Sequence, residues 1–313
     1  MPLLFHFFKL AHFVLFFRKS LFPTILVCII FSNISWAQSS IRQYQTTRLK
    51  STAGTGVGSI LMDEATILNP GTLGFYQSSS LYYQRNKGEQ DNPELLGKSS
   101  AIYRDNAIIL SDGNGSAAGS ISYINQKAGP EQRKTLGLAI SGPVSENSAL
   151  GLSYRRVKED ILLDGDLQDN SFHDFTIGVS HVLSQAFSYG IVIEDPLKKR
   201  SDNTFATLGL HYFAHEFISL MFDFGADYTG EIGQTYHYRG AFQVMFFNDF
   251  FVRAGYFHDE LVSETGNGIG LSWVGPRLMF DFAIQNIQKE YTIDDKGFEQ
   301  KIKETSFSLS YRF

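Results

Sequence analysis

The chain has 313 residues, a formal net charge of −5 and a single cysteine, Cys28. An acidic chain offers little attraction to nucleic-acid phosphates, and one cysteine excludes an internal disulfide or a site built from several thiolates. Aromatic residues make up 14% of the chain although the mean hydropathy is only −0.11, a combination expected of strands with one lipid face and one aqueous face.

The first 37 residues have the features of a cleaved signal peptide. They contain no Asp or Glu, carry three Lys or Arg, and become apolar from Leu21 onward. Ser35-Trp36-Ala37 has the small-x-small pattern of a cleavage site, so we expect cleavage after Ala37. A retained anchor is the alternative, but the apolar run from Leu21 to Ile34 is shorter than the roughly 20 residues of a spanning helix. After cleavage the mature chain would contain no thiol.

Residues 38–78 show no alternation of polar and apolar side chains. Glycine recurs at every second position from Gly54 to Gly58, Asp63-Glu64-Ala65 opens a short helix-like stretch, and Asn69-Pro70-Gly71 is a chain breaker. A phosphate-binding loop is the alternative for the glycines. The run lacks the Lys-Ser/Thr pair that such a loop needs, and no convincing strand precedes it.

This stretch resembles the N-terminal plug of the long-chain fatty-acid transporter family. The resemblance is carried by Gly54 to Gly58, by Asp63-Glu64-Ala65, and by Asn69-Pro70 followed by Leu73. It implies an outer-membrane barrel of fourteen strands with residues 38–78 as the plug, and it marks Asp63, Asn69 and Pro70 as plug positions. Smaller relatives include the barrel of the type IX secretion system, so the fold does not fix one function.

Residues 79–313 consist of short alternating segments separated by Gly, Asp, Asn and Pro, which is typical of strands and turns. After the signal, no stretch approaches 18 consecutive apolar residues, so a passage through the membrane would use strands. We therefore predict an all-β fold, a transmembrane antiparallel β-barrel of about 14 strands. The strands are predicted at 79–86, 99–111, 116–126, 133–142, 148–158, 171–182, 186–194, 203–213, 217–228, 237–247, 250–258, 264–274, 277–289 and 303–313.

The predicted connections alternate between long and short. Transmembrane barrels have short periplasmic turns and longer outer loops, so both ends of the barrel are expected on the periplasmic side. The long polar connections are 87–98, 127–132, 159–170, 195–202, 229–236, 259–263 and 290–302, and the tight turns are 112–115, 143–147, 183–185, 214–216, 248–249 and 275–276.

The last strand illustrates the two faces. Phe307, Leu309, Tyr311 and Phe313 alternate with serines and Arg312, so this apolar set is expected to face lipid. An aromatic last residue preceded by alternating apolar positions also resembles the signal recognised by the barrel-assembly machinery. We therefore expect that machinery as a partner during biogenesis.

Alternation also points five charged side chains into the lumen: Asp223, Asp227, Arg239, Arg253 and Asp281. Because the ninth and tenth strands are neighbours, Arg239 is predicted to pair with Asp223 or Asp227. Two interpretations remain open for the whole set. The residues either form a polar conduit or gate that contacts the plug, or a charge ladder that satisfies a filled lumen.

The remaining reactive side chains match no catalytic or metal-binding pattern. No recognisable motif places a Ser or Asp beside a histidine in or near the strands; these are His173, His181, His211, His215, His237 and His258. Asp164, Asp166 and Asp169 form an acidic loop without the spacing of a calcium-binding EF-hand. We predict no enzyme, no cofactor and no metal site.

The sequence thus predicts an outer-membrane protein, surrounded by outer-membrane lipid, that binds or transports a small hydrophobic compound. A non-transporting barrel that acts as a secretion or assembly partner is the alternative, and a lipid-modifying enzyme within a barrel is a third possibility. No nucleic-acid partner is expected.

Overall fold

The computed structural model describes residues 41–91, 101–115, 117–163, 166–198, 204–215, 217–230, 232–293 and 296–313. The predicted signal peptide, residues 1–37, lies outside these ranges. Among the described residues, no helix combines the length and the apolar character needed to cross a membrane.

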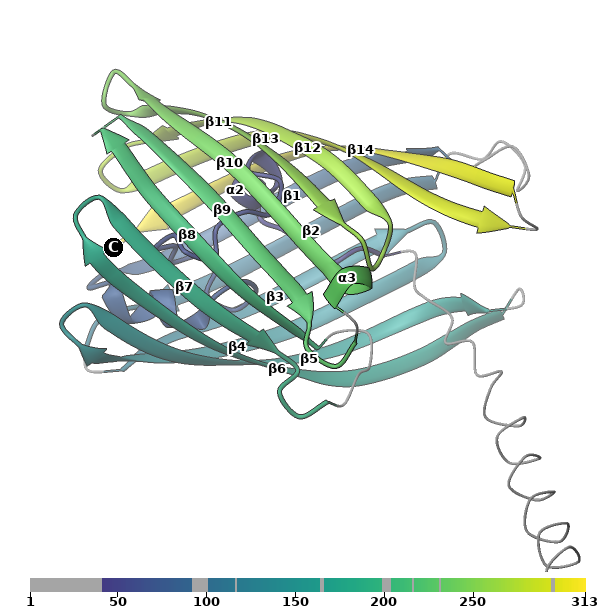
Figure 1. Ribbon diagram of the computed structural model, residues 1–313, viewed down its shortest axis with the longest axis horizontal. Helices are drawn as coiled ribbons and strands as arrows, with labels where there is room; N and C mark the ends of the chain where they lie inside the picture. Colours follow the sequence, from purple (N-terminus) through teal and green to yellow (C-terminus); the bar gives the residue numbers. More distant parts are fainter. Residues whose placement is uncertain are drawn as a thin grey trace, which may run out of the picture. The chain divides into compact units, whose positions relative to one another are not determined.

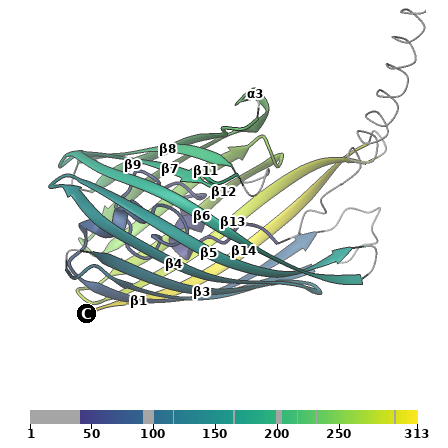
Figure 2. The same ribbon diagram turned by 90° about the horizontal axis from the view of Figure 1, so that it is seen from below.

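Antiparallel strands close into a barrel (Figures 1 and 2). Each strand pairs with its neighbours in sequence, and β14 pairs with β1. The strands are β1 (Ser79–Asp91), β2 (Ala101–Asp112), β3 (Ala118–Ala128), β4 (Glu131–Ser145), β5 (Ser148–Leu163), β6 (Asp166–Ser184), β7 (Phe187–Glu194), β8 (Phe205–His215), β9 (Ile218–Asp227), β10 (Tyr236–Phe246), β11 (Phe250–Asp259), β12 (Glu264–Val274), β13 (Leu278–Ile293) and β14 (Lys296–Arg312). The fourteen predicted strands are confirmed. Within the described ranges, three short helices accompany them: α2 (Thr47–Ser51), the 3₁₀ helix η1 (Pro70–Phe75) and α3 (Ile232–Thr235).

Closure leaves the barrel without a free sheet edge. The β1–β14 pairing runs from Ser80 opposite Arg312 to Asp91 opposite Lys301. Backbone hydrogen bonds of 3.0 Å in both directions join Ser79 and Phe313 and continue this seam to the last residue. In lipid, an unpaired edge would expose backbone N–H and C=O groups to a solvent that cannot bind them.

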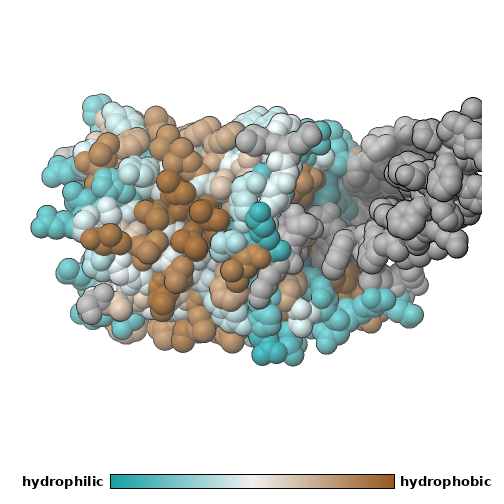
Figure 3. Space-filling model, turned by 60° about the horizontal axis from the view of Figure 1, so that its bottom comes forward, coloured by the Kyte–Doolittle hydropathy of each residue, from teal (hydrophilic) through white to brown (hydrophobic). Residues whose placement is uncertain are grey.

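The outer face carries an apolar belt, which appears brown across the middle of the barrel in Figure 3, with teal polar groups toward its ends. Large apolar side chains such as Ile121 and Leu271 are more than half exposed there, at 52% and 57%. On β14, Phe307 and Tyr311 are exposed while Ser306, Ser308 and Ser310 are buried. The predicted faces of the last strand, β14, are confirmed.

The predicted alternation of long and short connections is wrong in several places. β3 and β4 are joined by residues 129–130 alone, and β5 and β6 remain paired up to Leu163 opposite Asp166. β13 and β14 likewise pair up to Ile293 opposite Lys296. The polar residues interpreted as loops mark the point where the strands leave the apolar belt. Backbone pairing does not end there, because antiparallel strands pair equally well with water on one or both faces.

An arginine in the belt tests which part of the outer face lies in lipid. Ile121 lies on β3 between outward-facing Leu110 and Leu138. Ile121→Arg is expected to lower the free energy of unfolding in lipid vesicles by about 2–4 kcal/mol, the cost of arginine near the bilayer midplane. Asn125→Arg, on the same face of β3 nearer its outer end, is the control and should cost less than about 1 kcal/mol. Equal costs at the two positions would contradict the placement of the belt.

Candidate functional site

Residues 41–78, which we name the lumenal segment, lie against the inward faces of the strands; α2 is visible inside the barrel in Figure 1. Local caps set its two helices. The Thr46 side chain accepts a hydrogen bond from the backbone N–H of Leu49 at the start of α2. Asn69 caps η1 by accepting from the Gly71 N–H, and Pro70 occupies the first turn, where its missing N–H has no cost.

Three pairs of inward-facing glycines receive the backbone of the lumenal segment. Each pair lies directly opposite across two neighbouring strands: Gly151 and Gly178 on β5 and β6, Gly190 and Gly209 on β7 and β8, and Gly255 and Gly268 on β11 and β12. We call these residues the glycine pairs. The first pair meets residues 69–71, the second residues 57–58 and the third residues 50–52.

A side chain at five of these positions would collide with main-chain atoms of the segment, and one at Gly178 would collide with the side chains of Asn69 and Pro70. A Cβ at Gly209 would overlap the backbone N of Gly58, and one at Gly190 would overlap the carbonyl of Val57. Glycine permits this approach because it has no side chain. The segment is therefore seated backbone against backbone on the barrel wall.

The predicted plug residues supply polar contacts around this seat. Asn69 Nδ2 donates to the carbonyl O of Val57 at 2.9 Å and to Ser180 Oγ at 3.0 Å. Asp63 accepts hydrogen bonds from Ser80 Oγ at 2.5 Å and Ser310 Oγ at 3.0 Å. Asp63 thus spans the β1–β14 seam.

Glu64 lies buried beside Asp63 and accepts a hydrogen bond from Thr46 Oγ1 at 2.9 Å. Burial raises the pKa of Glu64 to about 7, against the opposing charge of Arg48. Burial also raises the pKa of Asp63. Around neutral pH the two adjacent carboxyl groups therefore carry less than two negative charges.

Asp223 and Arg239 lie directly opposite each other on β9 and β10, and both contact the lumenal segment. Asp223 Oδ2 accepts from the backbone N–H groups of Gly56 at 2.8 Å and Val57 at 3.1 Å. Arg239 Nη1 donates to the carbonyl O of Gly54 at 3.2 Å. The irregular backbone of the segment would otherwise be buried without partners. Contact with the segment takes the place of the direct ion pair that strand adjacency predicted.

The other three charged candidates make their ion pairs and side-chain hydrogen bonds with residues outside the lumenal segment. Arg253 Nη1 pairs with Asp281 Oδ1 at 3.1 Å across β11 and β13, with Ser272 between them. Asp227 accepts hydrogen bonds from Thr204 and Thr229 and so braces the β8 and β9 ends. These contacts are those of the charge-ladder interpretation.

One buried cluster escaped the sequence analysis. Lys50, only 3% exposed, forms ion pairs with Glu304 and, at 3.7 Å, with Asp105. Asn86 Nδ2 donates to Asp105 at 2.9 Å and to Glu304 at 3.1 Å. Arg42 adds an ion pair of 3.0 Å with Glu264. Carrying the alternation of the last strand two residues back from Ser306 would have placed Glu304 in the lumen.

A small cavity borders the segment. It measures about 60 Å³ and is lined by Val57, Leu68 and Phe205 with the polar His237 and Arg239 among its other neighbours. Pockets for drug-sized ligands usually measure about 300–1,000 Å³. Within the described ranges, no three His, Cys, Asp or Glu side chains are placed to hold a metal ion; Asp164 of the acidic loop lies outside those ranges.

No family model and no curated protein matches the sequence, but solved structures share the fold. The toluene transporter TodX of Pseudomonas putida is 11% identical, with a TM-score of 0.67 over 88% of this chain and 99% of that chain. The monoaromatic hydrocarbon channel CymD is 13% identical, with a TM-score of 0.64 over 85% and 96%. A FadL homologue of Pseudomonas aeruginosa is 13% identical, with a TM-score of 0.62 over 88% and 99%. The fold implied by the resemblance of residues 54–73 to fatty-acid transporter plugs is confirmed.

Removing the lysine tests how strongly the buried cluster holds the segment. Lys50→Met leaves Asp105 buried without its cation and leaves Glu304 with only the 3.8 Å ion pair to Arg42. We expect a loss of about 3–5 kcal/mol in the free energy of unfolding. Adding Asp105→Asn and Glu304→Gln should recover part of that loss. The exposed Lys87, whose side chain is 61% accessible, is the control, and Lys87→Met should cost under about 1 kcal/mol. Similar losses for the two lysine variants would contradict the assignment.

Proposed function

We propose that the protein is an outer-membrane channel for a small hydrophobic compound and that the lumenal segment is its plug. The fold is shared with proteins whose names specify toluene and monoaromatic hydrocarbons, over nearly their whole length. Those neighbours are channels and transporters, so the fold offers no support for an enzyme. The compound, rather than a protein, is the proposed partner.

The seat of the segment on the glycine pairs carries this proposal. A chain held by close backbone contacts and hydrogen bonds, with no covalent link, closes the lumen and can still be released. The cavity of about 60 Å³ beside Val57 is too small for a pathway through the barrel. A compound would therefore pass only after the lumenal segment moves as a whole. That movement would release α2 from β14 as well as residues 56–58 from Gly190, Gly209 and Asp223.

The same proposal includes removal of the signal peptide and recognition of the last strand during assembly. Cleavage near Ala37 would deliver residues 38–313 to the periplasm. The terminal set Phe307, Leu309, Tyr311 and Phe313 would then present the assembly signal to the barrel-assembly machinery. The outward exposure of Phe307, Tyr311 and Phe313 suits both recognition before insertion and contact with lipid afterwards.

Uptake of radiolabelled toluene into Gram-negative cells that carry the protein tests the proposal. We expect Gly209→Val to displace residues 57–58 and to raise uptake severalfold above wild type. Gly240→Val, on β10, is the matched control, because a Cβ at Gly240 meets no atom within 4 Å. Its uptake should equal that of wild type.

Two results would contradict the channel. In the first, neither the wild-type protein nor Gly209→Val raises uptake above the level of cells without the protein. Hydrogen exchange must show in the same experiment that residues 54–61 are released in the variant. In the second, the wild-type protein purifies with a stoichiometric protein partner and without a hydrophobic compound. The second result would favour the non-transporting barrel.

A further inference from the structure

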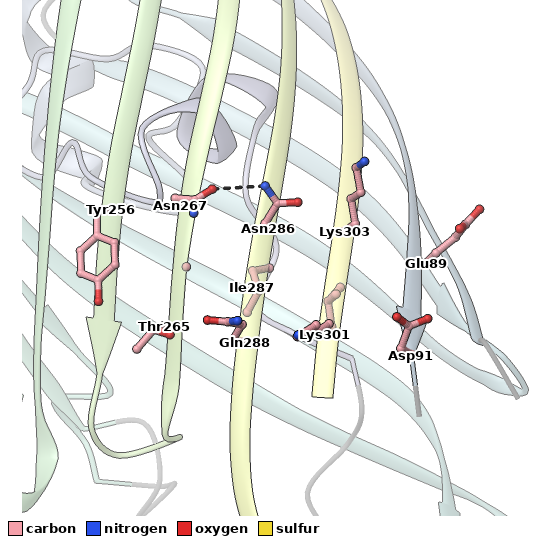
Figure 4. Close-up of a pocket in the computed structure, with 12 residues that line it drawn as sticks. Glu89, Asp91, Tyr256, Thr265, Asn267, Asn286, Ile287, Gln288, Lys301 and Lys303 are labelled. Carbon is pink, nitrogen blue, oxygen red and sulfur yellow. Dashed lines mark hydrogen bonds between the residues drawn. The ribbon is translucent and has the colours of Figure 1, made fainter. Parts of the chain in front are cut away.

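The outer face of strands β11 to β14 has a depression at the end of the barrel away from Phe313. On their inner face, Phe257, Ile287 and Ile302 pack with Ala53 of the lumenal segment. On their outer face, the same strands together with β1 border a cavity of about 410 Å³. We call this cavity the outer groove. It is bounded by Tyr256 on β11 and Glu89 on β1 (Figure 4).

Strand register aligns the outward side chains of the groove into rows. Tyr256, Asn267, Asn286, Lys303 and Glu89 are successive cross-strand partners on β11, β12, β13, β14 and β1. They lie side by side in Figure 4, where a hydrogen bond of 3.2 Å joins the side-chain amides of Asn286 and Asn267. A second row toward the strand ends contains Thr265, Gln288, Lys301 and Asp91.

The groove begins where the apolar belt stops. On β12 the outward face changes from Ile269 to Asn267, and on β13 it changes from Ile284 to Asn286. On β14 the outward face changes from Phe307 to Thr305 and Lys303. If the end with Phe313 is periplasmic, the groove lies at the level of the lipid headgroups in the outer leaflet.

The lining has the chemistry of a saccharide site with phosphate contacts at one side. The amides of Asn267, Asn286 and Gln288 can both donate to and accept from sugar hydroxyls. Tyr256, 47% exposed, offers an apolar ring face together with a hydroxyl group. An all-apolar lining, as on the belt, would suit acyl chains instead.

The charges divide across the groove. Lys301 and Lys303 lie on β14, where ammonium groups bind phosphate as point charges. Glu89 and Asp91 lie on the adjacent β1 and would accept hydrogen bonds from sugar hydroxyls. Lys301 contacts Glu299 at 3.5 Å and Lys87 contacts Glu89 at 3.7 Å, but these pairs are exposed. Exposed pairs contribute little, so they leave the groove's charges free to meet a ligand.

From these features we infer that the outer groove binds the phosphorylated saccharide headgroup of a glycolipid in the outer leaflet. The inference rests on the proposed membrane location and orientation, and it does not depend on transport. The indentation supplies the concave shape, the amide rows contact the sugar, and Lys301 and Lys303 contact its phosphates.

Native mass spectrometry of the mature protein in mild detergent tests the site with lipopolysaccharide as the probe. The test variant is Lys301→Glu with Lys303→Glu. Its control is Lys134→Glu with Lys158→Glu, two exposed outward lysines that face each other on β4 and β5. Asn286→Leu tests the amide row separately. Dephosphorylated lipopolysaccharide and phosphatidylglycerol serve as comparison ligands.

We expect the β14 double variant to weaken lipopolysaccharide binding about tenfold or more, because each surface lysine near anionic lipid strengthens the attraction. Asn286→Leu should weaken it without changing phosphatidylglycerol binding, and dephosphorylation should reproduce the loss of the lysines. The site would be overturned if both lysine double variants lost the same amount of lipopolysaccharide binding. It would also be overturned if the wild-type protein retained phosphatidylglycerol as well as lipopolysaccharide. Either result would indicate general charge attraction. Toluene uptake is measured on the same variants, so failure of the groove and failure of the channel are distinguishable.

Discussion

Close contact between the backbone of the lumenal segment and the inward glycine pairs is the constraint on which the interior of this barrel depends. An irregular chain inside a closed sheet brings N–H and C=O groups that no ladder satisfies. Side chains of the wall must then bind them, as Asp223, Arg239 and Ser188 do. The polar lumen follows from the presence of the segment as much as from contact with water.

The strands that hold the segment also carry the outer groove. Ala53 occupies the inner face where Phe257, Ile287 and Ile302 converge, and the hollow of about 410 Å³ lies on the other side of these strands. The interior contact and the outer groove therefore lie on opposite faces of the same strands.

The strands and their faces were predictable because the apolar belt imposes a period of two, which a single sequence displays directly. The inward position of Asp223 and Arg239 followed from that period. The resemblance to the fatty-acid transporter plug marked Asp63 and Asn69 as plug residues. The lengths of the outer connections were not predictable, because polar composition is shared by loops and by strands that extend into water, as at Leu163 opposite Asp166.

The buried cluster was hidden for a different reason. Lys50 belongs to a stretch without periodicity, and its partner Glu304 lies 254 positions away. Only the closed fold brings them together. The glycine pairs were equally invisible, because a glycine that faces the lumen looks in sequence like any turn or bulge residue.

The central claim is that the lumenal segment closes the channel and must move for a compound to pass. Thr47 Oγ1 and Ser306 Oγ lie 2.7 Å apart in the buried interior, so Thr47→Cys with Ser306→Cys can form a disulfide that fixes α2 to β14. Toluene uptake by the oxidised double variant should fall to the level of cells without the protein, and reductant should restore it, while each single variant behaves as wild type. Full uptake through the cross-linked protein would contradict the claim.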